Sequence, residues 1–123
     1  MEKARAIEGD AFSARCDADG SSFAVHLKGN ADMVVHDRLK TFLDEVVAAM
    51  RSKPRSEVLF VLTDLYFMNS SCLSLLVRFI NGVAELPARE RYRVRFRSNP
   101  NLRWQTKSLA ALRGFAEELV SVE

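Results

Sequence analysis

Alternating hydrophobic and polar positions near the start of the chain predict a β-hairpin. In residues 22–28 the apolar side chains fall on every second position, which is typical of a strand with one buried face. Residues 11–16 alternate in the same way, and the Asp, Gly and Ser residues at 17–21 favour a turn between the two segments. The apolar positions of the second strand are Phe23, Val25 and Leu27.

Two longer segments show the 3.6-residue period of an amphipathic helix. The first helix should end before Lys53 and Pro54, because the residue before a proline disfavours helical geometry. The second should end at Leu86 and Pro87. Met33 precedes the first helix at helical spacing and, like Phe42 and Phe79, is expected in the core. The apolar stripes are Val35, Leu39, Phe42, Leu43, Val46, Val47 and Met50 in the first helix, and Leu73, Leu76, Phe79, Ile80 and Val83 in the second.

The later part of the chain adds two strands and a helix. The apolar run at residues 58–62 predicts a central strand covered on both faces. Residues 92–97 alternate, as a strand with one buried and one solvated face would. We expect Asn99 to cap the last helix, with Pro100 in its first turn and Gly114 at its end.

A short strand at residues 119–122 completes the predicted order, β-β-α-β-α-β-α-β. This order predicts an α/β fold in which helices pack on a mixed β-sheet. A chain of 123 residues with 48% hydrophobic content can bury one core but not two. We therefore expect residues 1–123 to form a single domain.

Composition and charge do not identify a partner. The net charge is only +2, and the first residues lack the apolar core of a secretory signal. No stretch approaches the roughly 20 apolar residues of a membrane span, so we expect a cytoplasmic protein without membrane insertion. Cys16 and Cys72 lie far apart in the sequence, which favours reduced thiols.

The polar residues after the central strand are the candidate site. Loops at the carboxyl ends of parallel strands are where open α/β sheets bind ligands and partners, and Asn69, Ser70 and Ser71 occupy such a position. The same residues suit a helix N-cap, because their side-chain oxygens can accept hydrogen bonds from the first backbone amides. The local chemistry favours capping and leaves a binding role open.

Three motifs in order resemble the STAS domains of bacterial anti-sigma factor antagonists. Residues 67–73 are similar to the family's aromatic-apolar-Asp-Ser-Ser-Gly-Leu signature. Residues 25–32 resemble its early strand ending in Gly-Glu-Leu-Asp, and residues 109–115 its late Leu-rich helix ending in Gly-Leu. The resemblance spans residues 23–122 and implies a STAS-like fold.

The resemblance also implies a function by partner switching. In such a switch the unphosphorylated domain binds a serine-kinase anti-sigma factor, phosphorylation of the first serine of the signature breaks the complex, and a matching phosphatase reverses it. That serine is Ser70 in this chain, with Ser71 as the second candidate. The implied partner-binding residues are Met68, Asn69, Ser70, Ser71, Cys72 and Leu73.

The chain departs from the family pattern at the site itself. Asn69 replaces the Asp of the signature, which removes a charge beside Ser70. Cys72 replaces the Gly, which adds a side chain where a partner approaches. Val61 stands at the position of a strand Asp, with Asp64 three positions later.

The sequence leaves two alternative functions open. A STAS-like domain can instead serve as an accessory subunit of a transporter or of a lipid-trafficking complex. Cys72 and Arg78 have the Cys-x5-Arg spacing of tyrosine phosphatases, but the apolar residues between them should continue as helix. Because six helical residues rotate by about 240°, the two side chains should not converge, and we expect neither an enzyme nor a cofactor.

Residues 86–113 carry eight positive side chains against Glu90, a local charge of +7. Arg93, Arg95 and Arg97 should share one strand face, which suits either an acidic partner or a solvated edge protected by charge. Nucleic-acid binding is disfavoured because no aromatic platform accompanies the arginines. His26 and His36 have no third ligand at metal-site spacing, so no metal is expected.

Overall fold

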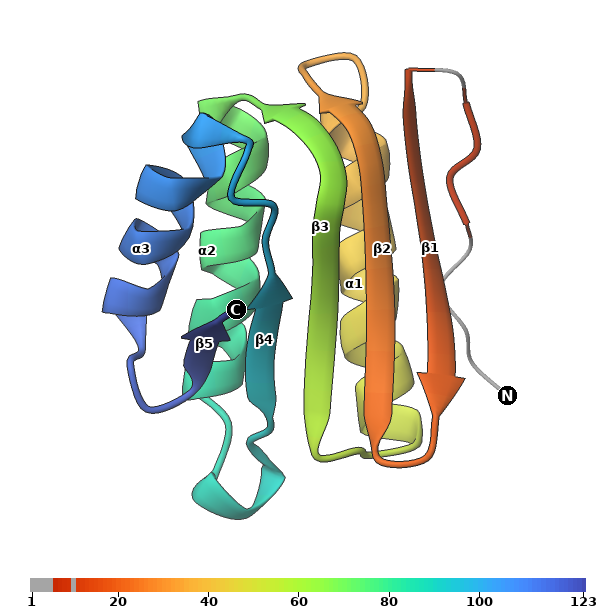
Figure 1. Ribbon diagram of the computed structural model, residues 1–123. Coiled ribbons are helices and arrows are strands. Elements are labelled where there is room, and N and C mark those ends of the chain that lie inside the picture. Colours follow the sequence, from red (N-terminus) through yellow and green to blue (C-terminus); the bar gives the residue numbers. More distant parts are fainter. Residues whose placement is uncertain (1–5, 10) are drawn as a thin grey trace.

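Five strands form one mixed sheet in a computed structural model that describes residues 6–9 and 11–123. The strands are β1 (Phe12–Asp19), β2 (Ser22–Ala31), β3 (Glu57–Met68), β4 (Arg93–Arg97) and β5 (Val120–Val122). They lie in the sheet in the order of the sequence. β1 and β2 are antiparallel, as the predicted hairpin requires, whereas β2 to β5 are parallel to their neighbours (Figure 1).

Three helices connect the parallel strands. α1 (His36–Ser52) follows β2, α2 (Ser70–Ala84) follows β3, and α3 (Arg103–Phe115) follows β4. A short 3-10 helix, η1 (Ala88–Glu90), precedes β4. Each helix connects a strand to its next neighbour in the sheet, and the three steps run in the same direction across the sheet. Because such crossovers are right-handed, their helices lie on the same face of the sheet. Figure 1 shows α1 and α2 behind the sheet. The predicted element order is confirmed.

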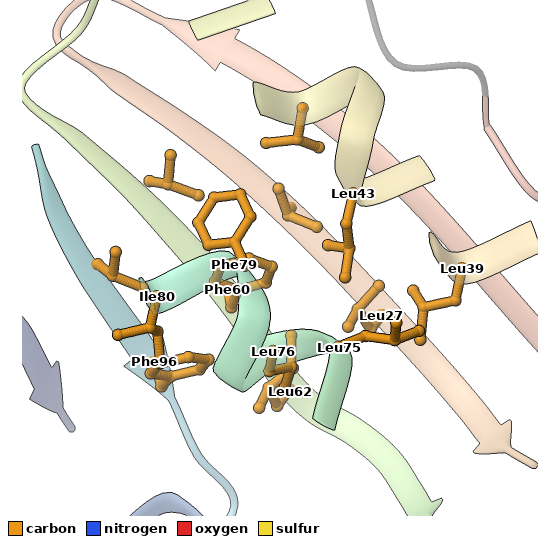
Figure 2. Close-up of a cluster of buried hydrophobic side chains, with 14 of the residues drawn as sticks. Leu27, Leu39, Leu43, Phe60, Leu62, Leu75, Leu76, Phe79, Ile80 and Phe96 are labelled. Carbon is orange, nitrogen blue, oxygen red and sulfur yellow. The ribbon is translucent and has the colours of Figure 1, made fainter. Parts of the chain in front are cut away.

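The core lies between this face of the sheet and the helices. Phe60 of β3 stands at its centre, with the ring of Phe96 stacked at a centroid distance of 5.2 Å and the ring of Phe79 edge-on at 5.3 Å. Figure 2 shows leucines from two strands and two helices around these rings. Leu27, Leu39, Leu62 and Leu76 are each no more than 1% exposed. The predicted apolar stripes of α1 and α2 therefore face the sheet.

The central strand differs from its prediction in length and in covering. β3 continues to Met68, six residues beyond the predicted apolar run. Among the described residues, helices cover only one side of β3. On the other side Leu59 is buried, but Val61 and Thr63 are partly exposed and Asp64 is exposed. The prediction that both faces are covered is therefore wrong beyond Leu59.

The last helix also begins later than predicted. Its N-cap is Leu102, so the assignment of Asn99 as the cap is wrong. The side chain of Asn99 instead accepts a hydrogen bond from the backbone N–H of Asn101 at 2.9 Å and donates to the Thr63 carbonyl at 3.0 Å. A short polar side chain before a helix can bond either to the helix or to its own turn, and here the turn is favoured.

No helix within residues 6–9 and 11–123 is both long enough and apolar enough to cross a bilayer. Cys16 and Cys72 are buried in different elements and form no disulfide. The reduced state of these thiols in the cell stays a prediction.

Candidate functional site

The junction of β3 and α2 is held together by Asn69. Its side-chain Oδ1 accepts a hydrogen bond from the backbone N–H of Cys72 at 2.8 Å, which is the usual N-cap contact to the third helical residue. Its own backbone N–H donates to the Ala31 carbonyl at 2.9 Å, at the end of the neighbouring strand β2. Asn69 therefore performs the capping that sequence chemistry assigned to the polar run.

The serines are free of this capping role. Ser70 is the first residue of α2 and is exposed, while Ser71 is half-buried. The hydroxyl of Ser74, one turn further on, donates to the backbone carbonyl of Ser70 at 3.0 Å. This bond uses the Ser70 backbone and does not involve the Ser70 hydroxyl. A hydroxyl at an exposed helix start is accessible to a modifying enzyme or a partner.

The predicted partner-binding residues divide into two groups. Met68 and Cys72 are buried, with exposed fractions of 8% and 0%, and belong to the core cluster. Leu73 is half-buried and packs against that cluster. Only Asn69, Ser70, Ser71 and Leu73 can therefore reach a partner with their side chains. Met68 and Cys72 instead pack in the core beneath the site.

Cys72 is not placed as a nucleophile. Its Sγ lies 3.5 Å from the carbonyl oxygen of Asp32, and burial, together with the nearby Asp32 charge, raises the pKa of the thiol. α2 continues as helix through Arg78, which is exposed and pairs with Asp44 at 3.0 Å. Because Cys72 points into the core and Arg78 out of it, the phosphate cradle of a cysteine phosphatase is not formed between them.

The loop between β2 and α1 adds an apolar surface beside the serines. Met33 and Val34 are 66% and 81% exposed, so the prediction that Met33 is a core residue is wrong. The carboxylate of Asp32 accepts a hydrogen bond from the Val34 N–H at 3.0 Å, which holds the loop in a turn. This loop touches the start of α2 through Asp32 and Cys72, and Figure 1 shows the loop and the β3–α2 junction at the same end of the sheet.

Two of the three arginines of β4, Arg95 and Arg97, are neutralised by ion pairs. Arg95 donates to Glu57 at 2.9 Å and to Glu123 at 3.0 Å, and Arg97 donates to Glu123 at 3.2 Å. The hydrogen bonds from Arg95 hold the pKa of the Glu123 carboxyl below its ordinary value. β4 lies between β3 and β5, so the interpretation of this strand as a protected edge is wrong.

The histidines lie beside carboxylates rather than in clusters. His26 Nε2 is 3.3 Å from an Asp17 oxygen, and His36 Nδ1 is 3.1 Å from an Asp37 oxygen. Burial lowers the pKa of His26, and Arg15 adds to this effect, while Asp17 opposes it. Within the described part of the chain, no three His, Cys, Asp or Glu side chains are grouped as metal ligands would be.

Among the solved structures similar to this chain are anti-sigma factor antagonists. One from Mycobacterium paratuberculosis is 16% identical, with a TM-score of 0.65 over 84% of this chain and 80% of that protein. SpoIIAA in its unphosphorylated form is 14% identical, with a TM-score of 0.54 over 89% and 87% of the two chains. The Bacillus cell fate determinant SpoIIAA in its phosphorylated form is 15% identical, with a TM-score of 0.53 over 89% and 90%.

These similarities show that the chain has the STAS fold of the anti-sigma factor antagonists, as the sequence resemblance predicted. No protein-family model matches the sequence, and no curated protein is significantly similar to it. The fold therefore rests on structural similarity, and the roles of Ser70 and its neighbours stay predictions.

Proposed function

We propose that this chain is a single-domain regulatory module that binds a protein partner through the edge of the sheet around Ser70, and that phosphorylation of Ser70 releases the partner. The observation that supports this most directly is the division of roles at the start of α2. Asn69 caps the helix, so the exposed Ser70 hydroxyl is left for another use. Structurally similar SpoIIAA is known in unphosphorylated and phosphorylated forms.

The docking surface in this proposal combines polar and apolar side chains. Asn69, Ser70 and Ser71 supply hydrogen-bonding groups, while the exposed Met33 and Val34 supply apolar contact area. Apolar centres with polar surroundings are the usual composition of protein interfaces. The kind of partner proposed is a serine-kinase anti-sigma factor, with a phosphatase to restore the binding form.

A phosphate on Ser70 should act on the interface and not on the fold. Phosphorylation adds about −1.5 to −2 charges at pH 7. The first turn of α2 contains no acidic residue, and the positive end of a helix dipole favours an anion, so the helix tolerates the group. Burying that charge against a partner beside Met33 and Val34 requires its desolvation, which opposes binding.

The test compares Ser70→Asp and Ser70→Ala with the wild-type protein. Each protein is immobilised and incubated with a lysate of its own cells and ATP, and mass spectrometry identifies the bound proteins and any phosphorylated residue. Titration calorimetry with the purified partner then measures the affinity. We expect Ser70→Ala to bind as the wild type does and Ser70→Asp to lose at least about tenfold in affinity, because the added charge is desolvated at the interface.

Two control variants make the result specific. Thr106→Asp adds the same charge to an exposed residue near the start of α3 that is not part of the proposed surface, and should leave binding unchanged. Ser71→Asp tests the second candidate serine. Wild-type affinity in Ser70→Asp, or an equal loss in Thr106→Asp, would contradict the proposal, and phosphate found only on Ser71 would move the switch to that residue.

A further inference from the structure

A basic surface lies at the end of the sheet opposite Ser70. The parallel strands β3 and β4 both begin at this end, so the loops that precede them lie side by side there. Their contact is direct, because the Arg93 N–H donates to the Ser56 carbonyl at 3.0 Å and Arg93 pairs in register with Glu57. In Figure 1 this end is at the bottom, and the β3–α2 junction is at the top.

Six cationic side chains gather on these loops and on the adjoining end of α1. Residues 85–93 also contribute two acidic side chains, Glu85 and Glu90, so the local net charge is +4. Glu117 and Glu118 lie further along the same edge, in the loop that leads to β5. The cationic residues, named the basic end below, are Arg51, Lys53, Arg55, Arg89, Arg91 and Arg93.

The charges of the basic end are not neutralised by ion pairs. None of the six residues forms a salt bridge within the part of the chain that the structure describes. Arg95 and Arg97, which follow Arg93 in β4, do form salt bridges. Arg55 donates to the Lys53 carbonyl, and Arg91 donates to the Leu86 carbonyl at 2.8 Å, which orders these loops without cancelling a charge. Only Arg51 lies in the last turn of α1, where a helix dipole favours a cation.

We propose that the basic end binds peripherally to the anionic headgroup surface of a phospholipid bilayer. Clusters of four to eight Lys and Arg residues are typical of protein segments that bind anionic lipid headgroups. The geometry fits a flat anionic surface because the cations come from neighbouring loops at one end of a sheet. Binding there leaves Ser70, at the other end, open to a protein partner.

Other polyanions fit this end of the molecule less well. A nucleic-acid duplex is read by a helix or strand pair placed in a groove, and single strands need exposed aromatic platforms. The aromatic side chains here, Tyr92 and Phe23, are only 8% and 3% exposed. The buried centre of a protein interface is usually apolar. None of the large exposed apolar residues lies within residues 51–56 or 85–93.

Vesicle co-sedimentation tests the proposal with the full chain. We expect the wild-type protein to bind phosphatidylcholine vesicles that contain phosphatidylserine at least about tenfold more strongly than phosphatidylcholine alone, and to dissociate as salt is raised. The variant Lys53→Glu with Arg89→Glu should lose that preference by at least about tenfold, since it changes two exposed cations of the basic end.

A matched control carries the same charge change elsewhere. Arg103→Glu with Lys107→Glu alters two exposed residues of α3 that form no ion pair among the described residues, and should keep the vesicle binding. Equal binding to neutral and anionic vesicles, an equal loss in the α3 control, or stronger binding to duplex DNA than to anionic vesicles would overturn the proposal. Ser70→Asp should bind vesicles as the wild type does, so this test is independent of the phosphorylation switch.

Discussion

Replacing Gln105 by Leu should strongly destabilise the protein, although leucine has nearly the same volume. Gln105 lies in α3 and is only 1% exposed. Its Nε2 donates to the carbonyls of Leu62 and Leu65 at 2.7 and 3.1 Å, and its Oε1 accepts from the Asn99 N–H at 2.7 Å. These bonds take the place of a neighbouring strand, because β4 pairs with β3 only as far as Val61.

The expected cost follows from the groups that lose their partner. The Leu65 carbonyl also accepts from Trp104 Nε1 at 3.1 Å, so it stays satisfied in Gln105→Leu. The Leu62 carbonyl and the Asn99 N–H lose the bonds to Gln105. A buried polar group left without a partner costs about 1–3 kcal/mol, so we expect a loss of about 3 kcal/mol in the free energy of unfolding. Gln105→Ala should lose more, because it also leaves a cavity.

Urea unfolding followed by the fluorescence of Trp104, the one tryptophan in the chain, measures this difference. The neighbouring Thr106 is exposed, so Thr106→Ala should change stability by no more than about 0.5 kcal/mol. If Gln105→Leu unfolds within about 0.5 kcal/mol of the wild type, the three hydrogen bonds do not stabilise the end of β3 as argued. If only Gln105→Ala is destabilised, packing and not hydrogen bonding explains the burial of this residue.

Three further predictions concern the site and the core. Asn69→Ala should lower the free energy of unfolding by about 1 kcal/mol through the lost helix cap, whereas Asn69→Asp should keep it, as denaturation will show. The Cys72 thiol should react with iodoacetamide much more slowly in the folded protein than in urea, because it is buried and its pKa is raised; equal rates would contradict its placement. Burial raises the pKa of Tyr92 to about 12, from an ordinary value near 10. The neutral side chain therefore contributes roughly 3 kcal/mol to stability below pH 10, and this contribution is lost as the pH rises toward 12. Tyr92→Phe should lack that part of the alkaline loss, and identical pH profiles for the two proteins would refute the assignment.

Hydrophobic periodicity predicted the elements whose stability comes from a continuous apolar face. α1 and α2 were predicted correctly because most apolar positions of their stripes are buried against the sheet. The last part of β3 was not predicted, since Thr63, Asp64 and Tyr66 are partly or fully exposed and give no alternating pattern. That segment is held by hydrogen bonds from α3, about 40 residues away, and such long-range bonds leave no local pattern in the sequence.

The candidate site was predicted in part. The sequence placed Asn69 and Ser70 at the start of a helix, and the structure agrees. It did not indicate that Met33 and Val34 are exposed, because an apolar pair just before a helix has the same spacing as its buried stripe. Gln105 could have been noticed, since it stands at helical spacing from the buried Leu109 and Leu112 and is the one polar side chain of that stripe.

Asn69 and Cys72, the two residues that differ from the STAS signature, both fit the fold without changing its shape at the site. Asn69 supplies the cap oxygen that an aspartate would supply, but without its negative charge. The side chain of Cys72 turns inward and is fully buried, so it adds no bulk to the face that a partner would approach. What changes at the surface is therefore the charge next to Ser70. The first turn of α2 contains no carboxylate of its own, and Asp32 of the neighbouring loop is the acidic residue whose charge acts on it, so the effect of a phosphate on Ser70 would depend mainly on the partner it faces.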